Sequence, residues 1–597
     1  MIERMKKITV LVSENEREKF LPWLKRAGVL HIRHVKTPVH HEINFLEDRI
    51  SKIERMLSIL SPYAEKRGEE MRESSHERDI LEMADKVETA RTAKESLLTS
   101  IEELKRQIQW FEPWGGFDPE DIAELKAKGI SIRFYRARKN ELNKPGQDKG
   151  YYVIGEKRGY AYLVAVSRGL DEETPVFEEM TPPPAGPEKM TEELEGLNSG
   201  IAEIDGFLKE AARALEAIKK CERKLKGERE VLKVKFGMQE EGKFSYLQGF
   251  CPVKMLSKIT SMAEHHGLGY LIEEPDNPDE TPTVITNPRW ISIIDPVFQF
   301  MNTLPGYNEF DISFYFLVFF SLFFAMLIGD AGYGLFFLLV TFLARRRLKD
   351  LPTEPFFLMY LLSVGTIVWG TVTGTWFGAE KIAQLPFFKG LVIERVNSFA
   401  DNNQDFLIYI CFLIGAVHLT IAHFLRGLKV INSARALAEA GWIMILWGMF
   451  FAAGKFVISK AFPSSALWLF VLGAGLVLLF SNPQKGILKG VLGTLAELPL
   501  SVISSFSDIV SYLRLFAVGY ATVIVAKSFN DMALAGGVHS VIGALAATVI
   551  LFLGHTLNII LGFMAVIVHG IRLNMLEFSS HLGMQWSGKK YEPFCEK

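Results

Sequence analysis

The pattern of hydrophobic and polar positions divides this chain into two halves. Up to about residue 300 it is rich in Glu, Lys and Arg and has no apolar run long enough to cross a bilayer. Beyond that point long apolar runs follow one another. A hydrocarbon core of about 30 Å needs about 20 apolar helical residues to span it. We therefore predict an α+β domain at 1–300 and an all-α polytopic membrane domain at 301–597.

Heptad repeats are the clearest pattern of the first half. Within 189–235, apolar residues alternate spacings of three and four at Leu194, Leu197, Ile201, Ile204, Leu208, Ala211, Leu215 and Ile218, and Leu225 continues the register. Within 42–110, the matching positions are Leu46, Ile50, Ile53, Leu57 and Leu60, then Leu97, Ile101, Leu104 and Ile108. Such a stripe is buried against a partner helix. The two segments predict an antiparallel coiled-coil stalk, although periodicity alone also fits an ordinary helical domain.

Two α/β lobes are predicted at the ends of this stalk. The insert at about 110–187 contains strand-like stretches such as SIRFYRA and GYAYLVAVS and forms the distal lobe. Residues 1–40 and about 240–300 also alternate apolar and polar residues, as in ITVLV and GYLIEEP, and form the proximal lobe.

Several chemical signals in this half are weak. Four histidines lie close together in the sequence, at His31, His34, His40 and His41. No Cys or HExxH pattern accompanies them, so we predict no metal site. The segment 237–243 is similar to a phosphate-binding loop, but Phe244 stands where Ser or Thr would hold magnesium. We therefore predict neither ATP hydrolysis by this chain nor any cofactor.

Charge and cysteine usage further limit the functional class and the compartment of the protein. The formal net charge is −2, with no basic surplus for nucleic acid. No two cysteines form a CxxC pair, so no disulfide framework is expected; they are Cys221, Cys251, Cys411 and Cys595. The N-terminal stretch MIERMKKITVLVSENE lacks the apolar core of a signal peptide, which favours a cytoplasmic first half.

The second half contains about eight predicted spans. They lie near 312–329, 331–347, 356–378, 406–425, 438–458, 466–481, 487–528 and 538–578. Basic clusters follow the second, fourth, sixth and eighth spans, so the positive-inside rule places these ends and the C-terminus in the cytoplasm. The last two spans are longer than a perpendicular crossing needs, so we expect both to be tilted.

The last two spans carry polar stripes at helical spacing. The first stripe is Glu497, Ser501, Ser504, Asp508, Ser511 and Arg514, and the second is Gly554, Asn558, Gly562, Ala565, His569 and Arg572. Charge inside lipid is costly unless it meets partners or water, and small residues allow close approach. We interpret the stripes as a partly hydrated seam that faces another membrane component. Asp330, in GDAGYG between the first two spans, fits a structural or a functional role.

At these residues the chain resembles a known family. SYLRLFAVGYA with Arg514 and VHGIRLNMLEFSSH with Arg572 are similar to the last two helices of subunit a of V-type and A-type ATPases, called subunit I in prokaryotes. The segments LIGDAGYG, MKKITVLV, AGVLHI and YLQGFCPV also fit, in order along the whole chain.

The resemblance implies a non-catalytic stator subunit. Its last helices would hold two half-channels for protons or sodium against a rotating proteolipid ring, with Arg514 facing the ring carboxylate and Arg572 supporting it. Its lobes would bind peripheral-stalk heterodimers of the E/G type, and a central-stalk cap subunit of the C/d type would be a further partner. Candidate channel residues are Glu497, Ser504, Asp508 and Ser511 on one helix and Asn558, His569 and Glu577 on the other, the last near the cytoplasmic end where ions enter.

The chain departs from eukaryotic members at two positions. Gly562 stands where they have a glutamate, and Thr522 where they have a histidine. The series of ion-transferring residues of the eukaryotic members therefore cannot be carried over to this chain in detail. The chain is also shorter, which indicates a prokaryotic plasma membrane. A secondary transporter with a cytoplasmic regulatory domain is the alternative; it predicts an internal repeat, and we find none. A membrane-anchored scaffold would leave both arginines unexplained.

Overall fold

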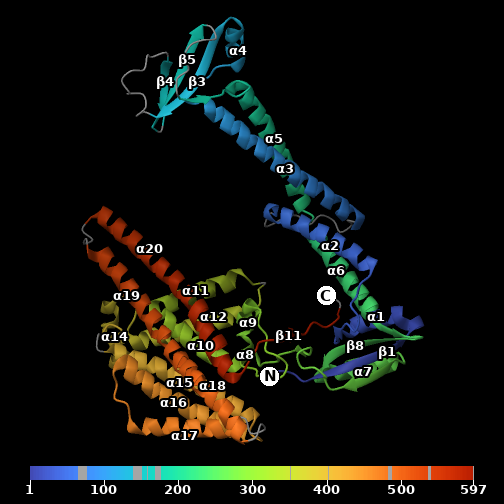
Figure 1. Cartoon of the computed structure of the whole chain (residues 1–597), viewed down its shortest axis with the longest axis vertical. Coiled ribbons are helices and arrows are strands. Elements are labelled where there is room, and N and C mark those ends of the chain that lie inside the picture. The colour runs from blue at the N-terminus through green and yellow to red at the C-terminus, as the bar shows by residue number, and fades with distance from the viewer. Residues whose placement is uncertain are drawn as a thin grey trace. The chain divides into compact units, whose positions relative to one another are not determined.

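Figure 1 shows the computed structural model of the chain. It describes residues 1–64, 77–138, 151–157, 159–168, 177–349, 351–400, 403–481, 487–535 and 540–595. Two compact units are present. One contains Met1–Thr9, Val29–His31 and Gly249–Pro593, and the other contains Val10–Gly28, Ile32–Gln248 and Phe594–Lys597. The predicted boundary near residue 300 differs from this division and stays a prediction.

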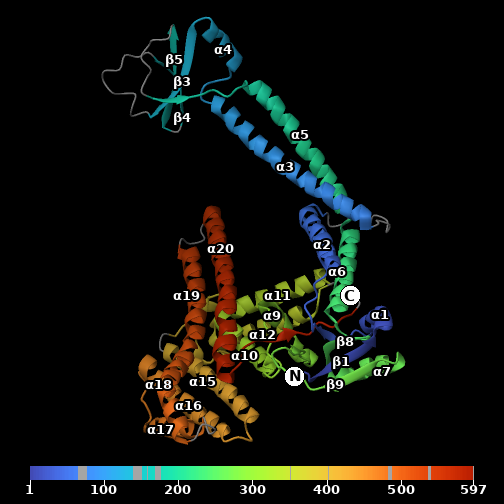
Figure 2. The ribbon, with the colours of Figure 1, turned by 45° about the vertical axis from the view of Figure 1, so that its right-hand side comes forward.

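Four long helices form the stalk of the second unit. They are α2 (His41–Leu60), α3 (Glu77–Phe111), α5 (Pro187–Ala212) and α6 (Leu215–Gly237). Helix α3 packs along α5, and α2 along α6 (Figures 1 and 2). Their shared core contains the heptad residues Ile50, Ile53, Leu208, Ile218 and Leu225. The stripes of apolar residues therefore meet one another, as in an antiparallel coiled coil.

A polar contact also joins the stalk helices. Lys94 of α3 lies 2.5 Å from Asp205 of α5, and the Tyr63 hydroxyl donates a hydrogen bond of 3.0 Å to the same carboxylate. The hydrogen bond from Lys94 lowers the pKa of Asp205 from its ordinary value. Since both side chains are partly exposed, this pair fixes the register of the helices more than it adds stability.

The distal lobe is a four-stranded antiparallel sheet at the end of α3 and α5. Its strand order is β4-β5-β3-β6. The strands are β3 (Ile130–Arg138), β4 (Tyr151–Lys157), β5 (Tyr160–Arg168) and β6 (Glu178–Met180), and α4 (Pro119–Ala127) precedes them. Trp110 and Trp114 pack edge-on against Phe134 of β3.

A second sheet has the order β2-β8-β1-β9, with β7 paired to β8. Its strands are β1 (Met5–Ser13), β2 (His31–Arg33), β7 (Gln239–Glu241), β8 (Phe244–Pro252) and β9 (Gly269–Glu273), with helices α1 (Arg17–Ala27) and α7 (Leu256–His265). The division between the two units passes through β1, β2 and β8.

The rest of the first unit is mostly helical. Short elements precede and interrupt the bundle: β10 (Pro282–Thr283), α8 (Arg289–Ser292), α9 (Asp295–Met301), α13 (Glu380–Ala383) and α14 (Pro386–Lys389). The long helices are α10 (Ser313–Ile328), α11 (Ala331–Arg347), α12 (Glu354–Thr373), α15 (Gln404–Lys429), α16 (Arg435–Ile458), α17 (Ser464–Phe480), α18 (Ile487–Ser511), α19 (Leu513–Ala535) and α20 (Val541–Ala565). Two π-helical segments, Val566–Gly570 and Leu573–Phe578, lead to α21 (Ser579–Leu582), and β11 (Lys589–Lys590) pairs with β10.

The first six predicted spans each coincide with one of these helices, the seventh covers α18 and most of α19, and the eighth covers α20 and the two π-helical segments. The number of crossings stays a prediction. Among the described residues, five helices are long and apolar enough to cross a membrane, including the continuous stretches Val491–Ala535 and Val541–Leu582. Helices α10 and α11 meet at a bend of 118° and add a sixth if they form one broken span, while α17 is shorter. A 42-residue or 45-residue helix exceeds what a perpendicular crossing needs.

Helix α10 forms the centre of this bundle. Most of its residues are buried, and its aromatic rings, such as Phe316, Phe320 and Phe323, belong to one core with Phe412 and Phe450. A helix that is apolar on all sides is expected in such a central position.

Candidate functional site

Two arginines of the apolar bundle, one partly exposed and one exposed, share one buried glutamate. Arg514 lies in the first turn of α19 and donates a hydrogen bond to Oε1 of Glu577. Arg572 lies between the two π-helical segments, and its Nε is 3.7 Å from the same oxygen. The Glu577 side chain is only 5% exposed. In the structure the Glu577 carboxylate contacts both arginines, and its predicted place at an ion entry stays a prediction.

The charges of this cluster do not cancel. A guanidinium stays protonated in proteins, so two arginines and one carboxylate leave one positive charge in excess. The contacts are also incomplete. Among the described residues, Nε of Arg514 and Oε2 of Glu577 are buried without a hydrogen-bond partner. The cluster therefore retains one positive charge that another acidic group could balance.

The polar stripe of α18 faces away from the interior of the bundle. Glu497 and Ser504 are exposed, and Asp508, Ser511 and Arg514 are partly exposed. These residues lie at helical spacing on one side, which matches the sequence interpretation. The stripe leads along α18 to the arginine cluster.

The polar stripe of α20 is different, and here the interpretation as one outward seam is wrong. Asn558 is buried and donates hydrogen bonds of 2.9 Å to the Tyr333 hydroxyl and 2.8 Å to the Thr522 carbonyl. A Cβ at Gly554 would lie 2.3 Å from the Phe529 ring. The small and polar residues at this end therefore serve packing within the chain. Only the part near His569, which is partly exposed, and Arg572, which is exposed, turns outward.

Asp330 has a structural geometry. It is the N-cap of α11, and its carboxylate accepts hydrogen bonds from the backbone N–H groups of Gly332, Tyr333, Phe377 and Gly378 at 2.7 to 3.3 Å. Its side chain is almost fully buried. Four N–H donors balance the buried charge and tie the bend between α10 and α11 to the segment after α12.

A chain of hydrogen bonds near Asp508 was not apparent from the sequence. Asp508 Oδ2 lies 3.0 Å from Nε2 of His581, whose Nδ1 lies 2.9 Å from Nε2 of His423. Nδ1 of His423 lies 2.7 Å from Oε2 of Glu439. Arg426 lies 3.1 Å from the other oxygen of Glu439. His423 and Glu439 come from consecutive helices, α15 and α16, but Asp508 and His581 come from α18 and α21, so no local motif indicates the whole set of contacts.

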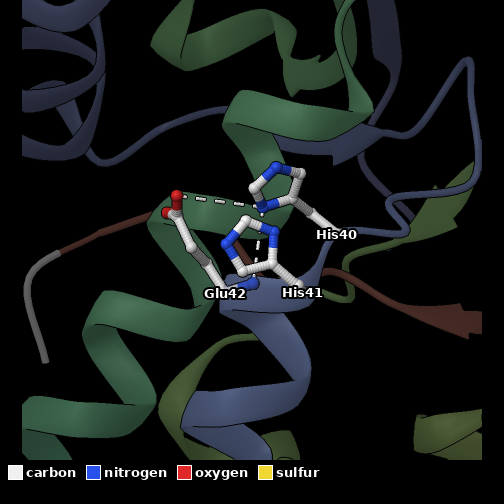
Figure 3. Close-up of side chains that lie close together, drawn as sticks. All are labelled: His40, His41 and Glu42. Carbon is white, nitrogen blue, oxygen red and sulfur yellow. Dashed lines mark hydrogen bonds and ion pairs between the residues drawn. The ribbon is translucent and has the colours of Figure 1, made fainter.

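A histidine cluster lies outside this bundle, in the stalk. The potential ligand atoms of His40, His41 and Glu42 lie within 4.8 Å of one another (Figure 3). However, Nδ1 of His40 accepts a hydrogen bond from the Glu42 N–H at the start of α2, and its ring stacks on Phe236 at 3.8 Å. These contacts describe a helix cap better than a metal centre.

The apolar helices, with the cluster of Arg514, Arg572 and Glu577 among them, and the stalk of paired helices define a multi-pass membrane protein. No family model matches the chain. V-type ATP synthase subunit I of Borreliella burgdorferi is 31% identical over 626 residues, covering 100% of this chain and 99% of that protein. V-type ATP synthase subunit I 1 of Treponema pallidum is 28% identical over 634 residues, covering 100% of both. The chain belongs to the family of V-type ATP synthase subunit I.

A solved structure was also matched. It is the cytoplasmic N-terminal domain of subunit I, a homolog of subunit a, of V-ATPase, at 14% identity and a TM-score of 0.21, covering 45% of this chain and 99% of that one. The family membership of the chain rests on the sequence relatives alone. As a subunit I, the chain is a membrane component of a rotary ATP synthase complex and a partner of other subunits in it.

Proposed function

We propose that this chain is the stator of the membrane motor. It conducts protons or sodium ions through two half-channels to and from a proteolipid ring, and its stalk binds peripheral-stalk subunits of the E/G type and a cap subunit of the C/d type. The N-terminal domain and the C-terminus lie in the cytoplasm of a prokaryotic cell, and the helices cross its plasma membrane. The chain itself carries no catalytic site.

The observation that carries the proposal is the excess positive charge at Arg514, Arg572 and Glu577. A ring carboxylate that passes Arg514 would gain an ion-pair partner, which favours release of its proton or sodium ion. The same charge repels a cation that tries to pass directly between the half-channels. The ion must therefore travel with the ring, and this requirement couples transport to rotation.

Glu577 supports this mechanism because it balances only one of the arginines. With no ring carboxylate opposite, Glu577 holds Arg514 and limits the cost of a charge in lipid. When a ring carboxylate arrives, it meets the part of the Arg514 side chain that stays exposed, which is 25% of it. The exposed side of α18, with Glu497, Ser504, Asp508 and Ser511, then supplies a polar path to this point, and His569 lies beside it on the other helix.

The test is ATP-driven ion uptake by the assembled complex in vesicles. We expect Arg514→Ala to abolish uptake while the complex assembles normally. Arg347→Ala, which removes an exposed arginine at the end of α11, is the matched control and should leave uptake unchanged. Full uptake by an assembled Arg514→Ala complex would refute the proposal. A secondary transporter would move its ion without ATP and without the other subunits.

A further inference from the structure

The hydrogen-bonded chain from Glu439 to Asp508 joins two carboxylates through two imidazoles. Its order is Glu439, His423, His581, Asp508, and each of its three links is 2.7 to 3.0 Å long. These are ordinary hydrogen-bond lengths. Arg426 forms an ion pair with Glu439 at one end, and Asp508 at the other end belongs to the polar stripe that leads to Arg514.

The exposure of the side chains differs along this hydrogen-bonded chain. The two imidazoles are buried, with His423 4% and His581 9% exposed. Asp508 is the open end, at 25% exposed, whereas Glu439 is 11% exposed and lies beside Arg426, which is 47% exposed. Asp508 can therefore exchange a proton with water or a partner directly, Glu439 can do so only through the small part of its side chain that stays exposed, and the buried middle excludes a hydrated ion.

The donors and acceptors fit two arrangements of equal composition. In one, Glu439 is ionised, His423 and His581 each carry their proton on Nδ1, and protonated Asp508 donates to Nε2 of His581. In the other, Glu439 is protonated and donates to Nδ1 of His423, both rings carry their proton on Nε2, and Asp508 is ionised. Every link then contains one hydrogen in either arrangement, since a neutral imidazole has one donor and one acceptor.

Moving from one arrangement to the other transfers protons without moving any heavy atom far. The Glu439 proton passes to Nδ1 of His423, the Nε2 proton of His423 passes to Nδ1 of His581, and the Nε2 proton of His581 passes to Asp508. Three O–H or N–H bonds break and three form. The carboxylate charge has moved from Asp508 to Glu439. The hydrogen-bonded chain returns to the starting arrangement when both rings release their hydrogen bonds and form them again in the opposite direction.

We propose that these four residues form a proton relay between the side of the membrane reached by Arg426 and the polar stripe of α18. The proposal rests on the stator function given above and narrows it, because the transported ion is then a proton. Hydrogen-bonded chains of Asp, Glu and His inside a membrane protein suit proton transfer, whereas a sodium ion would need oxygen ligands along the way.

The relay is tested with the complete complex in vesicles, by ATP-driven acidification. We expect His423→Ala and His581→Ala each to lower the rate at least about 100-fold, the lower end for a lost proton-transfer group, with normal assembly and ATP hydrolysis in detergent. Added imidazole should restore acidification in His581→Ala, because it supplies the missing ring; a residue that only supports the fold would gain nothing. Tyr512→Phe is the control, since it removes the hydrogen bond to neighbouring His418 but leaves the relay intact.

Three results would overturn the relay. The first is acidification within about two-fold of wild type in both histidine variants, which is less than a lost proton-transfer group costs. The second is an equal loss in Tyr512→Phe. The third is undiminished ATP-driven uptake of ²²Na⁺ by the wild type in the presence of a protonophore. The sodium result would leave the stator function standing, whereas full uptake by Arg514→Ala would remove both proposals.

Discussion

Gly519 allows α19 to pass α10 at close range, and this contact gives a sharp prediction. A Cβ placed on Gly519 would lie 2.2 Å from the carbonyl oxygen of Met326. Ordinary contact between such atoms needs about 3.5 Å. The obstacle is backbone, so no rotamer change relieves it, and one of the two helices must move by about 1 Å.

We expect Gly519→Ala to cost about 3 kcal/mol, the upper end for added volume in a packed core. The matched control is Gly493→Ala on α18, where a Cβ would meet no atom within 4 Å. There alanine should stabilise the helix by up to about 1 kcal/mol, because glycine is the poorer helix former. The same substitution is therefore expected to lower stability at one site and to raise it at the other, within one long helical segment.

The assay is thermal unfolding of the purified chain in detergent, followed by far-ultraviolet circular dichroism. About 2–4 °C per kcal/mol is typical of domains smaller than this bundle, so Gly519→Ala should lower the midpoint by several degrees and Gly493→Ala should raise it slightly. ATP-driven uptake should also fall in Gly519→Ala, since the shifted helix carries Arg514. If Gly519→Ala melted at or above the wild-type midpoint, the close packing of α19 on α10 would be incorrect.

Two further predictions concern charge. Glu577→Gln leaves Arg514 and Arg572 without a counter-charge, so the unfolding midpoint should fall by an amount that corresponds to about 3–5 kcal/mol. Adding Arg572→Gln to this variant should recover part of the lost stability. A double variant that is less stable than Glu577→Gln would contradict the shared ion pair. Burial, helped by the charge of Asp311, raises the pKa of Asp295 in α9 to about 6. The folded state therefore binds this proton more tightly than the unfolded state, and stability falls as pH rises from about 4 through 6. The unfolding midpoint of Asp295→Asn should lie above that of the wild type at a pH of about 7.5 and should equal it at a pH of about 4. If the two midpoints differed by the same amount at both pH values, Asp295 would not be the cause of the pH dependence.

The sequence predicted features that depend on local periodicity. Heptad spacing identified the stalk helices, because an apolar stripe at that period has to be covered by a partner. Hydropathy located the long apolar helices of the described residues, but not how many of them cross a membrane or whether α10 and α11 each do. Their bend follows from two adjacent residues: Gly329 ends α10 with a φ of 66°, and Asp330 caps α11. These residue types indicate a helix end and a helix start, but they do not determine the angle of 118° between the two helices.

The relay and the α20 stripe could not be predicted for a different reason. Both depend on which helices are neighbours in space. Asn558 looks like a channel residue on an isolated helix, yet Tyr333, more than 200 positions earlier, occupies the space beside it. Likewise His581 and His423 are 158 residues apart. A single sequence contains no record of such contacts.

Glu577 shows how local geometry can change the interpretation of a motif. Arg572 and Glu577 are five residues apart, and in an α-helix that spacing turns them about 140° away from each other. An α-helix would therefore hold the glutamate away from Arg572. The segment Leu573–Phe578 is instead π-helical, and a π-helix repeats its hydrogen bonds from i to i+5. Residues five apart then lie nearly above one another, so Arg572 and Glu577 come within 3.7 Å. One wider turn therefore supplies the counter-charge to both arginines, and an insertion or deletion that restored α-helical geometry here would separate Glu577 from Arg514 without changing either residue.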